Sequence, residues 1–249
     1  MDRSQELDYT AARVPIRDDL RAAQQFVWEH IGSPGTWWTG EQRVAIAAEA
    51  RHAAHCDLCG RRKAELSPHA FAGVHDTRAA LPPNVVDVIH RVRTDPGRLS
   101  RKWFDGVIAG GLGVPQYVEV VAVVALLSGL DFFARALGLA PFPLPPPVPG
   151  EPSRYLPSAA KPGTAWVPMI APQDAAGAEA ELYGDIPIVP HIMQALSVVP
   201  DEARALRRSS EAHYVPMVHL GNPTVGRCLD RMQIELVAAR VSALNECFY

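Results

Sequence analysis

The sequence predicts an all-α protein, a helical bundle. Apolar residues recur at spacings of three and four along most of the chain, whereas the alternating apolar–polar pattern of strands is almost missing. Prolines divide the chain, because 11 of the 23 fall between Pro141 and Pro172. Proline fixes φ and lacks an amide donor, so this stretch is expected to be an extended connector. We expect apolar side chains such as Trp166 and Ile170 to hold the connector to the surface.

Five helices are expected before the connector. Thr39 and Gln42 form a capping-box pattern, which opens a helix that should continue past two cysteines to about Leu66. The most apolar stretch, residues 117–137, is expected to be the central buried helix, and Gly138 ends it. The other three follow from the helical spacing of apolar residues and cover residues 18–30, 83–92 and 101–109.

Four more helices are expected after the connector, over residues 174–183, 190–197, 201–213 and 224–246. The chain should therefore consist of three parts. These are an N-terminal helical unit of residues 1–140, the connector of residues 141–172 and a C-terminal helical unit of residues 173–249.

The composition excludes several classes of protein. The 249 residues are 48% hydrophobic and 20% charged, with a formal net charge of −3, which is typical of a globular protein and argues against a nucleic-acid partner. The first residues are too charged for a signal peptide, and the apolar run 120–130 is shorter than the ~20 residues that cross a bilayer. We therefore expect no membrane partner and a cytoplasmic, reducing location, where structural disulfides are rare.

The most informative segment holds the motif Cys56-x-x-Cys59. If the helix continues through it, Glu49, His52 and both cysteines share one face, and His55 precedes Cys59 by one turn. A free thiol has a pKa of ~8.5, which nearby cations lower. The resulting thiolate can attack a peroxide or a disulfide, and the second cysteine then resolves the oxidised sulfur.

Two other interpretations of the motif remain open. Both cysteines could be buried and inert, as free cysteines often are. Alternatively, a transition metal could bind to His52, His55, Cys56 and Glu49, together with Cys59. Ligands from one short helix cannot all converge on a tetrahedral ion, so a metal would need donors from elsewhere; candidates are His90, Glu119, Glu235 and Cys247. Outside the motif, the pair His75-Asp76 is the best candidate for a role in a substrate pocket.

The segment 38–59 resembles the alkylhydroperoxidase D-like, or carboxymuconolactone decarboxylase-like, superfamily. The hallmark of that family is a helix with a Glu, a Cys-x-x-Cys twelve residues later and a His four residues after the second Cys. Residues 231–249 resemble it again, since Glu235 lies twelve residues before Cys247. The two matches cover roughly residues 35–141 and 180–249. The resemblance implies two tandem units, an attacking Cys59, a resolving Cys56, an external thiol reductant and assembly into a homo-oligomer.

The chain departs from the family pattern in both units. Val44 stands where the first unit should have its Glu, and Lys63 stands where it should have its His. The proton relay of the family is therefore missing in its usual form, and we expect Glu49, His52 and His55 to replace it. The second match reaches Tyr249, one residue before the position of the second Cys. Either the natural chain continues past Tyr249, or the second unit keeps one cysteine.

We therefore predict a thiol-based oxidoreductase that reduces peroxides or disulfides through Cys56 and Cys59, with no cofactor. The first alternative is a metal-binding enzyme or module at the same cluster. The second is a cofactor-free decarboxylase or isomerase-like enzyme of the same superfamily, in which Glu and His transfer protons. The predicted catalytic set is Cys59, Cys56, His55, His52, Glu49, Glu235 and Cys247.

Overall fold

The computed structural model describes residues 6–69, 71–184, 186, 188–219 and 221–245. Within these residues the chain forms nine α-helices and no strand, which confirms the predicted all-α class. The helices are α1 (Asp18–Gly32), α2 (Gly40–Ala53), α3 (Asp57–Ala64), α4 (Pro83–Thr94), α5 (Arg101–Ala109), α6 (Val114–Ala136), α7 (His191–Gln194), α8 (Pro200–His213) and α9 (Arg231–Leu244).

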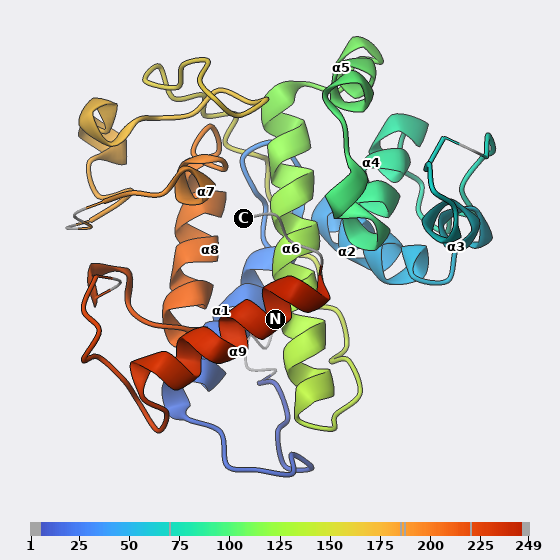
Figure 1. The fold of residues 1–249 in the computed structure, drawn as a ribbon. Coiled ribbons are helices and arrows are strands. Elements are labelled where there is room, and N and C mark those ends of the chain that lie inside the picture. Colours follow the sequence, from blue (N-terminus) through green and yellow to red (C-terminus); the bar gives the residue numbers. More distant parts are fainter. Residues whose placement is uncertain (1–5, 70, 185, 187, 220, 246–249) are drawn as a thin grey trace.

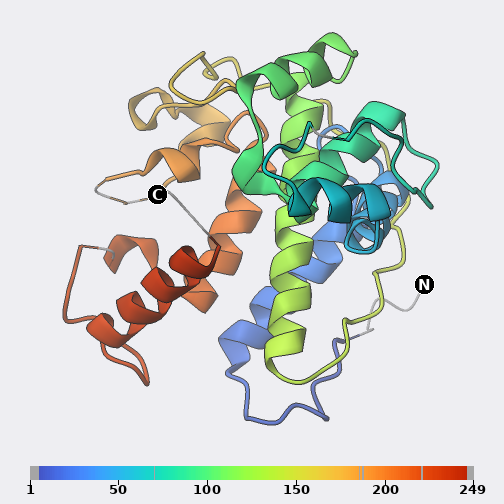
Figure 2. The ribbon, with the colours of Figure 1, turned by 45° about the vertical axis from the view of Figure 1, so that its right-hand side comes forward.

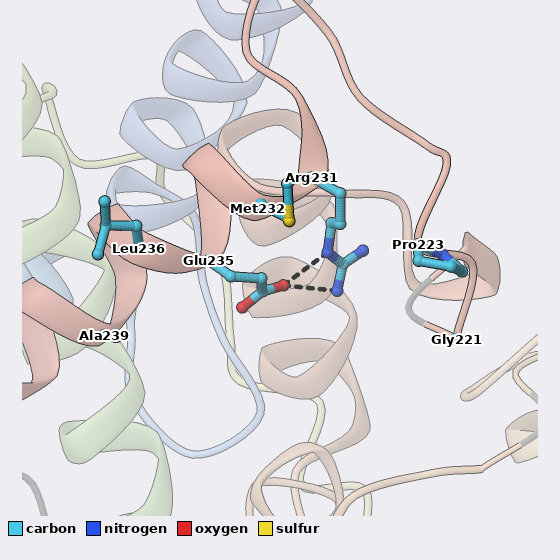
Figure 3. A pocket seen from close by; sticks show the side chains of 7 residues that line it. All are labelled: Gly221, Pro223, Arg231, Met232, Glu235, Leu236 and Ala239. Atoms are coloured by element: carbon cyan, nitrogen blue, oxygen red, sulfur yellow. Dashed lines mark hydrogen bonds and ion pairs between the residues drawn. The ribbon is translucent and has the colours of Figure 1, made fainter.

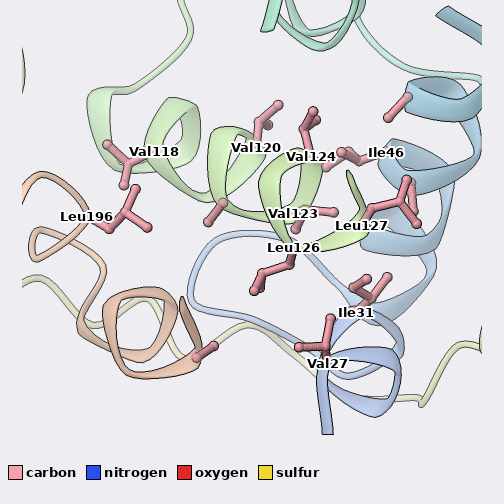
Figure 4. Close-up of a cluster of buried hydrophobic side chains, with 14 of the residues drawn as sticks. Val27, Ile31, Ile46, Val118, Val120, Val123, Val124, Leu126, Leu127 and Leu196 are labelled. Atoms are coloured by element: carbon pink, nitrogen blue, oxygen red, sulfur yellow. The ribbon is translucent and has the colours of Figure 1, made fainter. Parts of the chain in front are cut away.

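Helix α6 is the central element, as the sequence predicts, and α1, α2, α4 and α8 pack against it (Figures 1 and 2). Its valines and leucines are buried on nearly every side, and Figure 4 shows several of them facing Ile31 of α1 and Ile46 of α2. Each such side chain stabilises the fold by roughly 1.5–3 kcal/mol. By length and composition alone, α6 is the one helix in the described part of the chain that could cross a membrane, but most of its apolar stretch is buried by its neighbours.

Helix α2 begins as predicted, because Thr39 and Gln42 form the complete capping box. The prediction that it continues to about Leu66 is wrong. The chain leaves the helix after Ala53, turns, and extends at Cys56 (φ −74°, ψ 120°) before α3 starts. The backbone N–H groups of His55 and Cys56 donate to the carbonyls of His52 and Ala53, three residues earlier, a tightening that is typical of a helix end.

The proline-rich connector is extended, as predicted, and it packs along the turn between α1 and α2. Its backbone N–H at Val148 donates to the carbonyl of Gly32, and the indole of Trp28 donates to the carbonyl of Pro143. Close approach requires glycine at Gly40, where an added Cβ would lie 2.6 Å from the Val148 oxygen. Ile170 of the connector is fully buried, whereas Trp166 stays 38% exposed.

One hydrophobic core contains residues from all three predicted parts of the chain. Val199 and Ala205, from the predicted C-terminal unit, belong to the same buried cluster as α6, and so does Ile170. The helix expected over residues 174–183 is replaced by short 3-10 turns, and the last helix begins at Arg231 rather than near residue 224. No described residue of α9 is buried.

A buried charge network connects α1, α2, α6 and α8. The Arg43 guanidinium lies 2.6 Å from both Glu119 and Glu202, and all three side chains are at most 1% exposed. His30 lies 3.0 Å from Glu202, and the Trp37 N–H donates to the other oxygen of Glu119. Burial raises the pKa of Glu202, but Arg43 and His30 outweigh it and lower that pKa to about 2. The network therefore holds Glu202 ionised in the core.

Replacing Arg43 should be strongly destabilising. Arg43→Met leaves two buried carboxylates without their cation, and we expect a loss of about 3–5 kcal/mol in the free energy of unfolding, measured by urea denaturation. The matched control is Arg101→Met, because Arg101 pairs with Asp105 on the surface, at 61% and 54% side-chain exposure. That change should cost no more than ~0.5 kcal/mol. Similar losses for the two variants would contradict a stabilising role for the network.

Candidate metal centre

Four side chains converge at one end of the helical bundle: Cys56, Cys59, His75 and His90. Their donor atoms all lie within 4.8 Å of one another. The Cys59 sulfur is 3.4 Å from the Nδ1 atoms of both His75 and His90, and the Cys56 sulfur is 3.7 Å from that of His75. The two sulfurs and two ring nitrogens therefore surround a common point.

Three elements supply these side chains. Cys56 immediately precedes α3 and Cys59 lies in its first turn, so both sulfurs come from one helix start. His90 comes from α4, which packs against α3 (Figure 1). His75 lies in the loop of residues 65–82, which joins α3 to α4 and has no described helix or strand. All four side chains are largely shielded, with 3% exposure at Cys56 and 4% at Cys59.

Both imidazoles are held by carboxylates at the ring nitrogen that faces away from the sulfurs. His90 Nε2 lies 2.8 Å from Glu49, and His75 Nε2 lies 2.9 Å from Asp87. Each carboxylate is held in turn, Glu49 by the N–H groups of residues 78 and 79 and Asp87 by the indole of Trp103. This pairing assigns one proton of each ring to Nε2 and makes Nδ1 the nitrogen that faces the sulfurs, which is the ring orientation of metal-binding histidines.

The electrostatics of the cluster favour thiolate sulfur. Burial raises the pKa of Cys56. The Cys59 N–H, the His75 ring and the Asp76 N–H together lower it by more than burial raises it, so the net shift of this pKa is downward. Burial lowers the pKa of His75, but Asp87 and the two cysteines raise it to about 10. Burial also lowers the pKa of His90 below its usual value, against the effect of Glu49. The cluster therefore stabilises the thiolate of Cys56 and the positive charge of His75.

The structure brings Cys56, Cys59 and Glu49 together, but Glu49 reaches the thiols through His90. The expectation that His52 and His55 lie one turn below the thiols is wrong, because the helix breaks between them and Cys59. His52 instead pairs with Asp76 at 3.0 Å, and His55 is exposed in the turn. The donor atoms that the structure brings together are therefore those of Cys56, Cys59, His75 and His90, and of the predicted metal set of His52, His55, Cys56 and Glu49 they include only Cys56.

Glu235, predicted for the second unit, lies elsewhere. It is on α9, which is remote from α3 in Figure 1, and it bonds to Tyr214 and Arg231. Glu235 and Arg231 line an open hollow of about 630 Å³, and Figure 3 shows the two side chains pointing toward each other. Glu119, a suggested extra ligand, belongs to the Arg43 network. Cys247 lies outside the described residues.

Sequence reasoning missed Asp87 and Trp103, and it did not bring His75 and His90 together at the sulfurs. His75 stood out through the pair His75-Asp76, but as a substrate-pocket residue, and His90 was named as a donor from elsewhere. Asp87 and Trp103 belong to no recognisable motif. The available signal for Asp87 is its spacing of three residues from His90, which places both side chains on one face of a helix.

No protein-family model matches this chain, and neither a curated protein nor a solved structure does. The resemblance to the alkylhydroperoxidase D-like superfamily therefore stays a prediction that the motifs alone carry.

Proposed function

We propose that Cys56, Cys59, His75 and His90 bind a zinc ion. The observation that carries the proposal is the convergence of four shielded N and S donors, with each imidazole fixed by a carboxylate. In a tetrahedral site with Zn–S of about 2.3 Å and Zn–N of about 2.05 Å, sulfur and nitrogen ligands lie about 3.6 Å apart. Three of the four S···N distances in the cluster, 3.4, 3.4 and 3.7 Å, fit that spacing.

The donor set favours zinc in a structural role. Two thiolates and two imidazoles are soft to borderline ligands, which select zinc over magnesium or calcium. Four protein ligands complete a tetrahedral shell, whereas catalytic zinc sites keep one position for water. Two thiolates also balance the charge of a divalent ion. The proposed function is therefore a closed Cys₂His₂ zinc centre that stabilises the fold around it.

The local packing shows what such a zinc ion would stabilise. Cys56, Leu58, Cys59 and the nearby Phe71 form a small apolar cluster separate from the main core. The loop 65–82 is largely exposed, with Val74 at 92%. So little buried apolar surface contributes little free energy, and a metal cross-link from His75 to α3 and α4 would supply what the packing lacks.

The first prediction for this centre concerns metal content. Protein purified without chelators or an affinity tag should contain about one zinc per chain by elemental analysis, because a complete four-ligand site binds tightly. His75→Gln should lose most of this zinc. His52→Gln is the matched control, since His52 is also shielded and paired with an aspartate but lies outside the cluster. Zinc at background level in the unmodified protein would refute the proposal, and so would equal losses in both variants.

A second prediction concerns the carboxylate behind His75. Asp87→Asn removes the charge that orients the imidazole, and zinc affinity should fall by roughly 10–100-fold. Competition with a chromophoric chelator measures this affinity. Asp105→Asn is the control, because Asp105 is on the surface in a pair with Arg101. An unchanged affinity in Asp87→Asn would contradict the role assigned to the carboxylate.

A second candidate function is the reduction of peroxides or disulfides by the same thiols. The hydrogen-bonded series Glu49–His90–Cys59 favours it, because a carboxylate-backed imidazole beside a thiol can accept the thiol proton. Under this proposal the chain consists of two alkylhydroperoxidase D-like units, with Cys59 as the attacking thiol and Cys56 as the resolving one. Each turnover oxidises both thiols to a disulfide, which an external thiol then reduces.

Thiol chemistry would be tested on zinc-free, reduced protein. Peroxide should remove two free thiols per chain, and a dithiol reductant should sustain turnover. Glu49→Gln should slow this turnover by roughly 10²-fold or more, because His90, the general base, loses the carboxylate that orients its ring and stabilises its protonated form. A Cys56→Ser/Cys59→Ser double variant that keeps its activity would refute the thiol mechanism and favour the cofactor-free decarboxylase or isomerase-like alternative.

A further inference from the structure

The two sulfurs of the centre differ in their surroundings. Cys56 lies in the turn before α3, where Ala54, His55 and Asp57 on either side are all exposed. Cys59 is one turn further into α3, and its sulfur lies between the rings of His75 and His90. Cys56 is therefore the cysteine that borders the exposed turn, although both side chains are nearly buried, with 3% exposure at Cys56 and 4% at Cys59.

We propose that the centre is a peroxide-sensitive switch. The Cys56 thiolate attacks a peroxide, and the Cys56–Cys59 disulfide then forms. The zinc leaves, and the loop 65–82 is released. This inference rests on the proposed zinc centre. It assigns the first attack to Cys56, whereas the family resemblance implies Cys59.

The chemistry balances with a peroxide as the oxidant. The Cys56 thiolate attacks the O–O bond, which gives a sulfenic acid at Cys56 and one hydroxide or alkoxide. The Cys59 thiolate then attacks the Cys56 sulfur, the S–S bond forms and a hydroxide leaves. Both leaving groups take up protons from water. The two thiolates supply two electrons, and zinc, having lost two anionic ligands, departs as the hydrated ion. Because both sulfur atoms lie within 4.8 Å of each other, the second step needs little movement.

Release of the loop follows from how it is held. His75 ties the middle of the loop to the centre, and Phe71 packs against the small cluster of Cys56, Leu58 and Cys59. The backbone N–H groups of Arg78 and Ala79 hold its end to Glu49. The loop has no described helix or strand that would keep it in place by itself. Once the sulfurs are oxidised, His75 loses both its thiolate partners and the metal, so local opening becomes easier.

Trypsin cleavage after Arg78 can measure how far the loop 65–82 has opened. Arg78 is exposed, and it is the one lysine or arginine between Lys63 and Arg91 in the sequence, so trypsin cleavage there reports on the loop. The experiment uses the full chain with Cys228→Ser and Cys247→Ser, which leaves Cys56 and Cys59 as its cysteines. Zinc-loaded protein is treated with hydrogen peroxide, and three quantities are followed: zinc release to a chromophoric indicator, the disulfide by mass spectrometry, and cleavage at Arg78.

We expect one zinc released per disulfide formed, and cleavage at Arg78 about tenfold faster, because cleavage follows the population of locally opened chain. A dithiol reductant with added zinc should reverse both changes. If zinc loads at one per chain but stays bound with both thiols intact under excess peroxide, the switch is refuted and the zinc centre stands. If zinc leaves without faster cleavage, the release of the loop is refuted. If no zinc binds, the zinc centre itself is refuted, and this inference with it.

A pair of single variants tests the assignment of Cys56. Cys59→Ser and Cys56→Ser each remove one ligand, so both lose zinc binding and differ mainly in which sulfur remains. With peroxide and a sulfenic-acid trap, the remaining Cys56 should be labelled several-fold faster than the remaining Cys59. Equal rates, or faster labelling of Cys59, would overturn the assignment.

Discussion

The arrangement around the thiols depends on one interaction, the hydrogen bond from each imidazole Nε2 to a carboxylate. Glu49 and Asp87 fix the rotation of the two rings, so the opposite nitrogens, on His90 and His75, point at the sulfurs. An imidazole without such a partner could turn and offer either nitrogen to the solvent. Glu49 also accepts hydrogen bonds from the end of the loop 65–82. The same carboxylate therefore holds both the His90 ring and the backbone that leads into α4.

The sequence predicts the fold well where local signals and burial agree. The capping box at Thr39 and the apolar stretch of α6 each specify their element without help from distant residues. The break between Ala53 and Cys56 could not be predicted in this way, because alanine and histidine there give no stop signal. After the break, the Cys56 sulfur contacts the ring of His75, which is 19 residues further along the chain and outside any local pattern.

The site was predictable in part for the same reason. The Cys-x-x-Cys spacing identifies two donors, because only two residues lie between the cysteines and their sulfurs can meet whatever the local structure is. The histidines that meet them lie 16 and 31 residues from Cys59 along the chain, and no periodic pattern joins them to it. The sequence analysis continues helix α2 through the Cys-x-x-Cys motif, and it therefore places His52 and His55 beside the sulfurs instead of His75 and His90. One error about a helix end thus changed both of the histidines expected beside the cysteines.

The charges in the cluster decide what it can hold. Two thiolates beside Glu49 and Asp87 would place four negative charges in a largely buried site, which is unfavourable unless positive charge joins them. Against the lowering effect of burial, Asp87 and the two cysteines raise the pKa of His75 to about 10, so that ring can supply one positive charge as a proton. The proposed zinc ion would supply two positive charges and would replace that proton at Nδ1. The proposed metal binding and the proposed thiol chemistry would therefore compete for the same sulfurs. Oxidation to a disulfide would remove both negative charges at once, and with them the reason for the cation to stay.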